Sequence, residues 1–282
     1  MIRLSHLLLF SLLIILTACF KEDRYDNTKD LEFLETNAQR SDVTVRPSGL
    51  QVRVINEGNA EGRTPEEDSV VRVHYLGSLV SGKVFEDTRD RDFPLQIKVE
   101  EQVEGFIEGL KLMKPGAKYE LVIPPQLGFG NFPPSGSPIP PGAVLIIEVE
   151  LLEVLTKEEA FIEAYLRDYP NTITTPEGAY LRYYRRGSGR RPVSQNTTVQ
   201  IHYTGYLIDG DEFDNNYDMA DPFLRISDLH NGLREAMLHI PAGSEFELVV
   251  PSELAYGVTP PDDSGIPAHA TLIFDVVFYA IR

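Results

Sequence analysis

The side chains that could do chemistry in this chain are aromatic rings accompanied by a carboxylate. The chain contains 13 Tyr and 14 Phe but no Trp, and Cys19 is its single cysteine. Rings with a few polar groups suit a pocket that binds an apolar ligand. The histidines lack metal-ligand spacing and the glycines form no phosphate-binding loop, so we expect neither a metal nor a cofactor. Taken singly, alternating Tyr, Phe and Ile residues in strands usually belong to a core, so only the wider pattern favours a site.

These residue types occur twice along the chain. His74-Tyr75 recurs as His202-Tyr203, and the same offset links Gly77 to Gly205, Phe85 to Phe213 and Leu95 to Phe223. Past a deletion of one residue, the shortened offset links Gly105 to Gly232, Gly130 to Gly257, Ile139-Pro140 to Ile266-Pro267 and Ala143 to Ala270. A constant offset over so many turn and apolar positions indicates two copies of one domain.

Each copy reads mostly as strands. Runs rich in β-branched residues predict strands over 51–55, 70–74, 119–123 and 144–152, and over 181–184, 199–203, 246–250 and 271–278. A short helix is predicted over 106–113 and again over 233–239, each followed by proline and glycine. Alternation turns His74 and His202 to the face opposite Tyr75 and Tyr203, so we expect these two histidines to serve the fold. Antiparallel strands covered by one helix make an α+β domain.

The repeat includes a helical segment before each copy. Phe33-Leu34-Glu35 matches Phe161-Ile162-Glu163, and Thr156 is a candidate cap for the second helix, with Glu158 and Glu159 near its positive end. Pro170 lies where that helix should stop. We expect both helices to be structural.

Longer motifs resemble one known family. In the second copy, Val199 to Gly205, Leu207 to Gly210 and Phe213-Asp214 are followed by Leu254 to Gly257 and Ile266 to Val276. The first copy carries Val73 to Gly77, Phe85-Glu86, Gly128 to Gly130 and Ile139 to Pro141. In this order the motifs resemble the FKBP-type peptidyl-prolyl isomerases. The resemblance implies domains over 45–155 and 177–282, with a linker helix in 156–176 and a tether with a short helix in 19–44.

The resemblance also implies a fold and a site. In that family a curved antiparallel sheet wraps around one short helix, and an aromatic cup lies between them. Tyr203, Phe213, Asp214, Tyr256 and Phe274 would be the catalytic residues of the second copy. Its substrate would also contact Phe223, Leu233 on the floor of the cup, Ile266 at the rim, and the backbone N–H of His230. The family usually has Trp at the floor position. Its arginine partner for the carboxylate falls at Met219, which predicts a less firmly held Asp214.

The first copy keeps the cup but has fewer polar groups. Its substrate-binding residues would be Tyr75, Phe85, Glu86, Val103, Phe106, Phe129, Ile139 and Ile147. Glu86 replaces the aspartate, Phe129 lacks the hydroxyl of the rim tyrosine, and Ile147 stands where an aromatic residue is common. We therefore expect the second copy to be the better catalyst.

The activity implied by the resemblance is rotation about X–Pro peptide bonds in exported proteins. The uncatalysed barrier is about 18–20 kcal/mol, because rotation destroys amide resonance. No bond is made or broken, so the expected partners are proline-containing peptides or unfolded exported proteins, without a cofactor. Two alternatives remain at this stage: a peptide-binding chaperone without useful catalysis, and a structural lipoprotein that uses the tandem as a spacer.

The charge and the N-terminus suggest where the protein works. The formal net charge of −17, with 26 basic against 43 acidic residues, argues against nucleic acid as a partner. Leu7 to Leu16 form an apolar run of signal-peptide length, and the following Leu16-Thr17-Ala18-Cys19 resembles a bacterial lipobox. We therefore expect residues 1–18 to be a signal peptide and Cys19 to carry lipid. No Asp directly follows Cys19, which favours the periplasmic side of the outer membrane, with the cell surface as the alternative.

Overall fold

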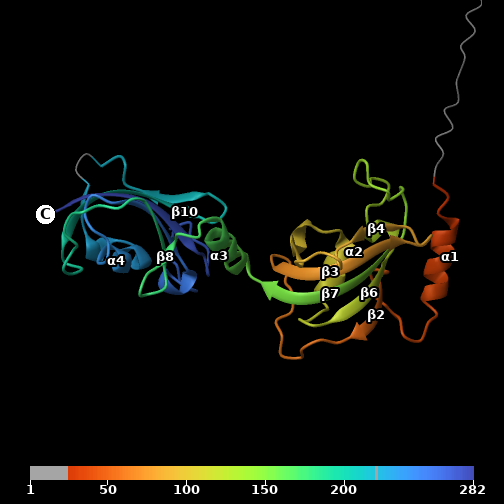
Figure 1. Cartoon of the computed structure of the whole chain (residues 1–282). Helices are drawn as coiled ribbons and strands as arrows, with labels where there is room; N and C mark the ends of the chain where they lie inside the picture. Colours follow the sequence, from red (N-terminus) through yellow and green to blue (C-terminus); the bar gives the residue numbers. More distant parts are fainter. Residues whose placement is uncertain (1–24, 220–221) are drawn as a thin grey trace, which may run out of the picture. The chain divides into compact units, whose positions relative to one another are not determined.

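The computed structural model describes residues 25–219 and 222–282. Within these residues the chain forms two antiparallel sheets of seven strands, and a short helix packs on each (Figure 1). The helix of the first sheet is α2 (Glu104–Leu110), and that of the second is α4 (Asn231–Met237). The predicted α+β class with two tandem copies of one domain is confirmed.

The two sheets have the same topology. In the first, the strand order is β1-β2-β6-β7-β3-β4, with β5 paired to β3. Its strands are β1 (Thr44–Val45), β2 (Gln51–Asn56), β3 (Val70–Leu79), β4 (Val84–Asp87), β5 (Leu95–Lys98), β6 (Lys118–Ile123) and β7 (Leu145–Leu155). The first sheet also has two 3-10 turns, η1 (Val99–Glu101) and η2 (Pro125–Leu127).

The second sheet runs β11-β10-β14-β13-β9-β8, and β12 pairs with β10. Its strands are β8 (Ile173–Thr174), β9 (Tyr180–Arg185), β10 (Thr198–Leu207), β11 (Glu212–Asn215), β12 (Phe223–Arg225), β13 (Glu245–Val250) and β14 (Leu272–Ile281). The 3-10 turns η3 (Ile226–Asp228) and η4 (Ser252–Leu254) complete it. The shortest strands of both sheets escape prediction because four residues or fewer give no clear alternation.

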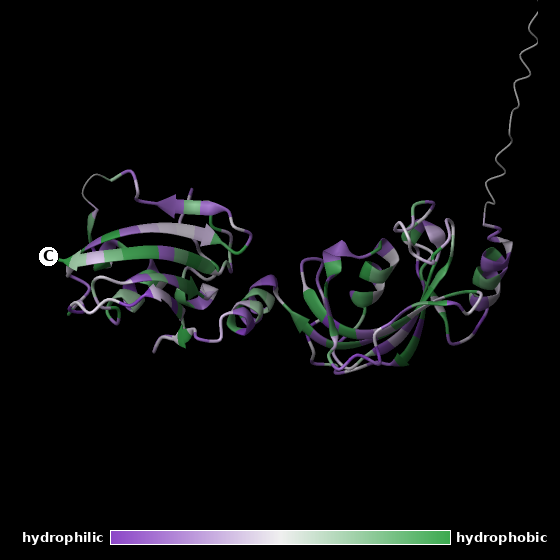
Figure 2. Cartoon of the chain, turned by 45° about the horizontal axis from the view of Figure 1, so that its top comes forward, coloured by the Kyte–Doolittle hydropathy of each residue, from purple (hydrophilic) through white to green (hydrophobic). Residues whose placement is uncertain are grey.

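Each sheet curves around its helix, and the core lies between them (Figure 2). In the second sheet, Val199, Ile201 and Tyr203 alternate toward the helix, where Leu233 and Met237 are fully buried. Alternate residues of a strand share one face, so this pattern directs one side of the strand into the core. Burying each aliphatic side chain stabilises the fold by about 1.5–3 kcal/mol.

Both short helices begin two residues earlier than the sequence predicts. Gly105 and Gly232 lie inside them, although glycine is a poor helix former. A Cβ at Gly105 would lie 2.5 Å from Ile123, and one at Gly232 would lie 2.1 Å from Val250. The glycines therefore allow the helix to approach the sheet closely, a tertiary reason that local propensity does not reveal.

A longer helix precedes each sheet, as predicted: α1 (Thr28–Asn37) and α3 (Lys157–Asp168). The capping box of α3 is confirmed: the Thr156 hydroxyl accepts from the Glu159 N–H at 3.0 Å, and the Glu159 carboxylate accepts from the Thr156 N–H at 2.7 Å. Tyr165 of α3 donates to Glu247 on β13 at 2.6 Å.

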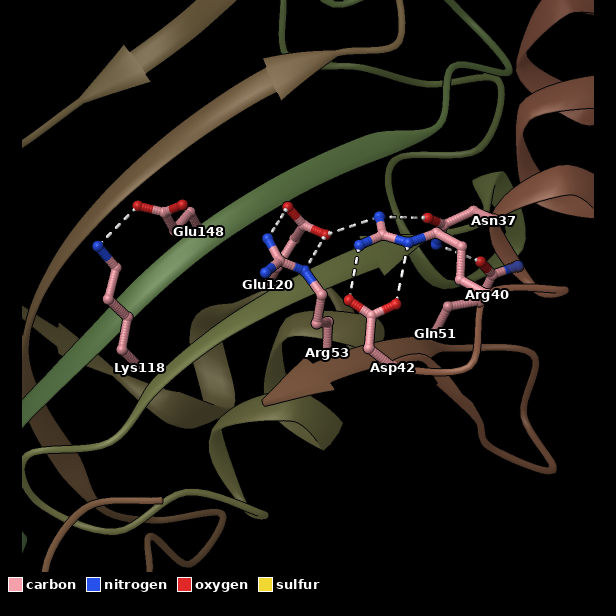
Figure 3. Close-up of polar contacts among 8 residues, drawn as sticks. All are labelled: Asn37, Arg40, Asp42, Gln51, Arg53, Lys118, Glu120 and Glu148. Atoms are coloured by element: carbon pink, nitrogen blue, oxygen red, sulfur yellow. Dashed lines mark hydrogen bonds and ion pairs between the residues drawn. The ribbon is translucent and has the colours of Figure 1, made fainter. Parts of the chain in front are cut away.

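Polar contacts hold the end of α1 to the first sheet (Figure 3). Asn37 donates to the Gln51 side chain at 2.7 Å, and Gln51 donates to the Leu34 carbonyl at 2.9 Å. Beside them, Arg53 and Glu120 form a two-bond ion pair between β2 and β6 at 2.9 and 2.8 Å, and Lys118 pairs with Glu148 at 2.8 Å. This face of the sheet is thus polar, in contrast to the face that covers the helix.

The predicted signal peptide and Cys19 lie outside the described residues. In the part of the chain that the structure describes, no helix is long and apolar enough to cross a membrane.

Candidate functional site

Three neighbouring strands of the second sheet bring the predicted aromatic residues together. Tyr203 lies on β10, Phe213 on β11 and Phe274 on β14, and Gly205 pairs with both Asp214 and Phe274. The Phe213 ring fills the space above Gly205, where a Cβ would lie 2.5 Å from the ring. The first sheet repeats this packing, because a Cβ at Gly77 would lie 2.4 Å from Phe85. A glycine at this position is therefore needed for the wall of each cup.

The rings of the second cup meet edge to face. Phe213 and Phe274 have centroids 5.7 Å apart at 83°, and Tyr203 and Phe274 are 6.3 Å apart at 67°. Such contacts stabilise aromatic clusters by about 0.5–1.5 kcal/mol beyond burial alone. Tyr203 and Phe274 are buried, whereas Phe213 and Tyr256 are half-buried. The cup is therefore rigid at its base and partly open at its edge.

Hydrogen bonds link the polar groups of this cup. The Tyr203 hydroxyl donates to Asp214 Oδ2 at 2.6 Å, and His230 Nε2 lies 2.9 Å from the same oxygen. His230 Nδ1 lies 2.5 Å from the Tyr256 hydroxyl. The absence of an arginine at Met219, whose side chain is exposed, does not leave Asp214 loosely held. The imidazole of His230 takes over that role, contrary to the sequence-based expectation.

Burial keeps both tyrosines of this network neutral. Desolvation raises the pKa of Tyr203, and its hydrogen bond to Asp214 raises it further. Desolvation also raises the pKa of Tyr256, with the Asp214 charge adding to it. Both hydroxyls therefore remain hydrogen-bond donors over the physiological pH range.

Leu233, Ile266 and His230 lie where the sequence analysis placed them around the cup. Leu233 is fully buried on α4, and Ile266 is buried in the loop before β14. His230 and its counterpart Val103 are the N-cap residues of α4 and α2. Their backbone N–H groups have no hydrogen-bond partner among the described residues. Unpaired N–H groups at a helix start can donate a hydrogen bond to a ligand carbonyl.

The structure does not bring Phe223 into this cluster. Phe223 pairs with Gln200, whereas its neighbour Leu224 pairs with Val199 and packs on the core. Cross-strand partners share a face, so the Phe223 ring lies on the side of the sheet opposite Tyr203, where Arg282 covers it at 5.1 Å. The one-residue deletion falls before this strand, and the offset that linked Leu95 to Phe223 does not hold here.

The first sheet assembles the same wall with different polar contacts. Tyr75 meets Phe106 edge to face, with centroids 5.7 Å apart. Glu86 forms an ion pair with Arg91 and, within the described residues, makes no bond to the Tyr75 hydroxyl. Desolvation raises the pKa of Tyr75, and the Glu86 charge adds to it.

The remaining residues of the first cup are apolar. Ile139 and Ile147 are buried, and Phe85, Val103 and Phe129 are half-buried. Val103 cannot bridge a carboxylate and a hydroxyl as His230 does, and Phe129 has no hydroxyl to bridge. The role of the His230 side chain was missed from the sequence, where only its backbone was considered. The available signal was a polar residue at a position where the other copy has valine.

Metal-binding groups are not clustered in the described part of the chain, where no three His, Cys, Asp or Glu side chains lie close enough to share an ion.

Comparisons with known proteins agree with this geometry. Residues 61–152 and 189–278 match the family described as FKBP-type peptidyl-prolyl cis-trans isomerase. The chain is 45% identical over 125 residues to the FKBP-type 22 kDa peptidyl-prolyl cis-trans isomerase of Escherichia coli, covering 44% of this chain and 59% of that protein. It is 30% identical over 264 residues to the peptidyl-prolyl cis-trans isomerase FKBP10 of Mus musculus, covering 89% of this chain and 41% of that one.

Among solved structures, the crystal structure of FkpA from Escherichia coli is 37% identical, with a TM-score of 0.42, over 45% of this chain and 58% of that one. The chain spans about half the length of the curated relatives it matches.

Proposed function

The chain belongs to the family of FKBP-type peptidyl-prolyl cis-trans isomerases, and from this premise we propose that it catalyses rotation about X–Pro bonds in exported proteins. The observation that carries the proposal is the second cup, where the rings of Tyr203, Phe213 and Phe274 meet edge to face and the Tyr203 hydroxyl donates to Asp214. The catalytic units are residues 45–155 and 177–282, joined by the linker helix within 156–176. The matched ranges 61–152 and 189–278 lie inside these bounds and support them.

The cup suits this reaction because the twisted amide has less charge separation than the planar one. A dry aromatic pocket binds the planar, well-hydrated amide less favourably than the twisted one. The proline ring fits among the aromatic side chains, with Leu233 beneath it and Ile266 at the rim. The unpaired N–H of His230 holds the carbonyl that precedes or follows the proline.

A protease-coupled assay on an Ala-Leu-Pro-Phe peptide tests the activity. The whole chain without residues 1–18 should accelerate isomerisation above the uncatalysed rate. A folded chain that leaves the rate unchanged at micromolar concentration would refute catalysis.

Peptide binding without efficient turnover is the second candidate function, and the first cup favours it there. Glu86 is engaged by Arg91, Phe129 lacks a hydroxyl and Ile147 replaces an aromatic ring. Tyr75, Phe85, Val103, Phe106 and Ile139 still line an apolar cup. The test is suppression of aggregation of a refolding client in the presence of a variant whose second cup is disabled by Phe213→Ala. Loss of suppression in that variant would argue against a binding role for the first cup.

We propose that Cys19 carries lipid and anchors the protein to the outer membrane, facing the periplasm. The lipobox-like segment and the acidic charge support this, because an acidic chain has no attraction to anionic lipid. A Cys19→Ala variant should leave the membrane fraction, while a Ser11→Ala variant should remain. Digestion by protease added to intact cells would place the protein at the cell surface instead.

A further inference from the structure

The imidazole of His230 lies in the middle of the second cup. Its centroid is 5.4 Å from the ring of Phe274, 5.5 Å from Phe213, 5.9 Å from Tyr256 and 6.2 Å from Tyr203. Only 19% of the His230 side chain is exposed. The ring therefore occupies space among the same four aromatic residues that the proposed function assigns to a proline ring.

The two imidazole nitrogens also engage the polar groups of the cup. A neutral ring protonated at Nε2 donates to Asp214 Oδ2 at 2.9 Å and accepts from the Tyr256 hydroxyl at Nδ1 at 2.5 Å. The same Asp214 oxygen accepts from Tyr203 at 2.6 Å. The carboxylate oxygen and the Tyr256 hydroxyl are thus already hydrogen-bonded before a peptide arrives.

We propose that the side chain of His230 closes the second cup, so that a peptide enters only when the imidazole turns away. This rests on the proposed isomerase function and describes its regulation at the same site. Entry of a peptide breaks two hydrogen bonds, one of them to a charged group, and reduces the apparent affinity accordingly. The first cup has Val103 at this position and needs no such opening.

The groups that face His230 hold its ring in place. They are Asp214 on β11, Tyr203 on β10 and Tyr256 after η4, while Arg234 lies on its own helix. The Phe213 and Phe274 rings complete the surroundings without charge.

The test replaces His230 by the residue of the first cup. In the whole chain without residues 1–18, His230→Val should raise kcat/KM on Ala-Leu-Pro-Phe about five- to tenfold, mainly through a lower KM. His239→Val is the matched control, since His239 is exposed and pairs with Glu177 at 3.1 Å, away from the cup.

An unchanged or lower kcat/KM in His230→Val would overturn the proposal. Long-range ¹H–¹⁵N spectra of the histidines provide a readout that does not depend on catalysis. They should show His230 protonated at Nε2 with slow exchange, and addition of the peptide should accelerate that exchange. Fast exchange between both tautomers in the free protein would also overturn the closure. If the spectra show the closed ring and its release by peptide while no variant isomerises the peptide, the isomerase function fails and the closure stands.

Discussion

Val103 and His230 occupy the same position at the start of the helix in the two halves of the chain, yet they leave the two cups in different states. In the first half, the carboxylate of Glu86 turns to Arg91 and the aromatic cup is lined by apolar groups. In the second half, one hydrogen-bonded network lies among the aromatic side chains of the cup and joins Asp214, Tyr203, Tyr256 and His230.

The difference shows that one scaffold can hold a weakly polar cup and a strongly polar one. The walls are alike because Gly77 and Gly205 allow the same phenylalanine to pack against the sheet. The polar groups differ because Glu86, Val103 and Phe129 of the first cup correspond to Asp214, His230 and Tyr256 of the second, while the strand order is the same. Catalytic strength and ease of entry are therefore separate properties of the two cups, and single substitutions can change either one.

The largest expected effect comes from the base of the second cup. Phe274→Ala removes a fully buried ring and should lower the free energy of unfolding of that sheet by about 3–5 kcal/mol. Ile147→Ala, at the matching position of the first sheet, should cost less, because the side chain is smaller. Native-state hydrogen exchange measures the stability of the two sheets separately, through the amides of β10 and β14 in the second and of β3 and β7 in the first. This is needed because a chain of two domains need not unfold in one step. Equal losses of protection would contradict the larger contribution expected from the Phe274 ring.

Removal of the phenylalanine ring from the wall of either cup should show how much that cup contributes to the activity of the whole chain. Phe213→Ala should lower kcat/KM of the whole chain about tenfold, which corresponds to about 1.4 kcal/mol of transition-state stabilisation. Phe85→Ala should lower it less than about twofold, because the first cup contributes less turnover. Circular dichroism must show both variants folded. A larger fall for Phe85→Ala would reverse the proposed order of the two cups.

The smallest expected effect lies on the outer faces of the sheets, at Asp275 and its counterpart Glu148. Burial raises the pKa of Asp275, the Glu247 charge adds to this, and a hydrogen bond from Tyr184 opposes it. A carboxyl with a raised folded-state pKa makes the fold less stable as the pH rises through that pKa. Asp275→Asn should therefore stabilise the second sheet by about 0.5 kcal/mol at pH 7, after allowance for solvent screening.

Glu148→Gln should have the opposite sign, because it breaks the ion pair with Lys118, which contributes about 0.5 kcal/mol. Native-state hydrogen exchange at pH 7 and near pH 4.5 measures the stability change of each variant. The gain from Asp275→Asn should shrink at the lower pH, where Asp275 is increasingly protonated in the fold. A gain that is independent of pH would exclude the ionisation of Asp275 as its cause.

Features that depend on local geometry could be predicted from the residues alone. Strand alternation predicted that His202 and Tyr203 face opposite ways, and His202 indeed stacks on Tyr217 at 4.8 Å while Tyr203 contacts Phe274 across the core. The capping box of α3 was equally readable, because Thr156 and Glu159 need only their own turn of helix. The duplication and the α+β class followed from spacing and period alone.

Contacts between segments that are distant along the chain could not be predicted in this way, because they depend on how the strands pair and how the helix packs on the sheet. The register of β12 on β10 placed Phe223 on the outer face, and the close approach of helix to strand placed Gly105 and Gly232 inside their helices. His230 joins Asp214 and Tyr256 because a helix start, a strand and a loop converge on one cup. No local pattern encodes that convergence, since each of the three segments has an ordinary sequence for its own structure. The hydrogen bonds of His230 depend on the long-range strand pairing that sets these segments side by side.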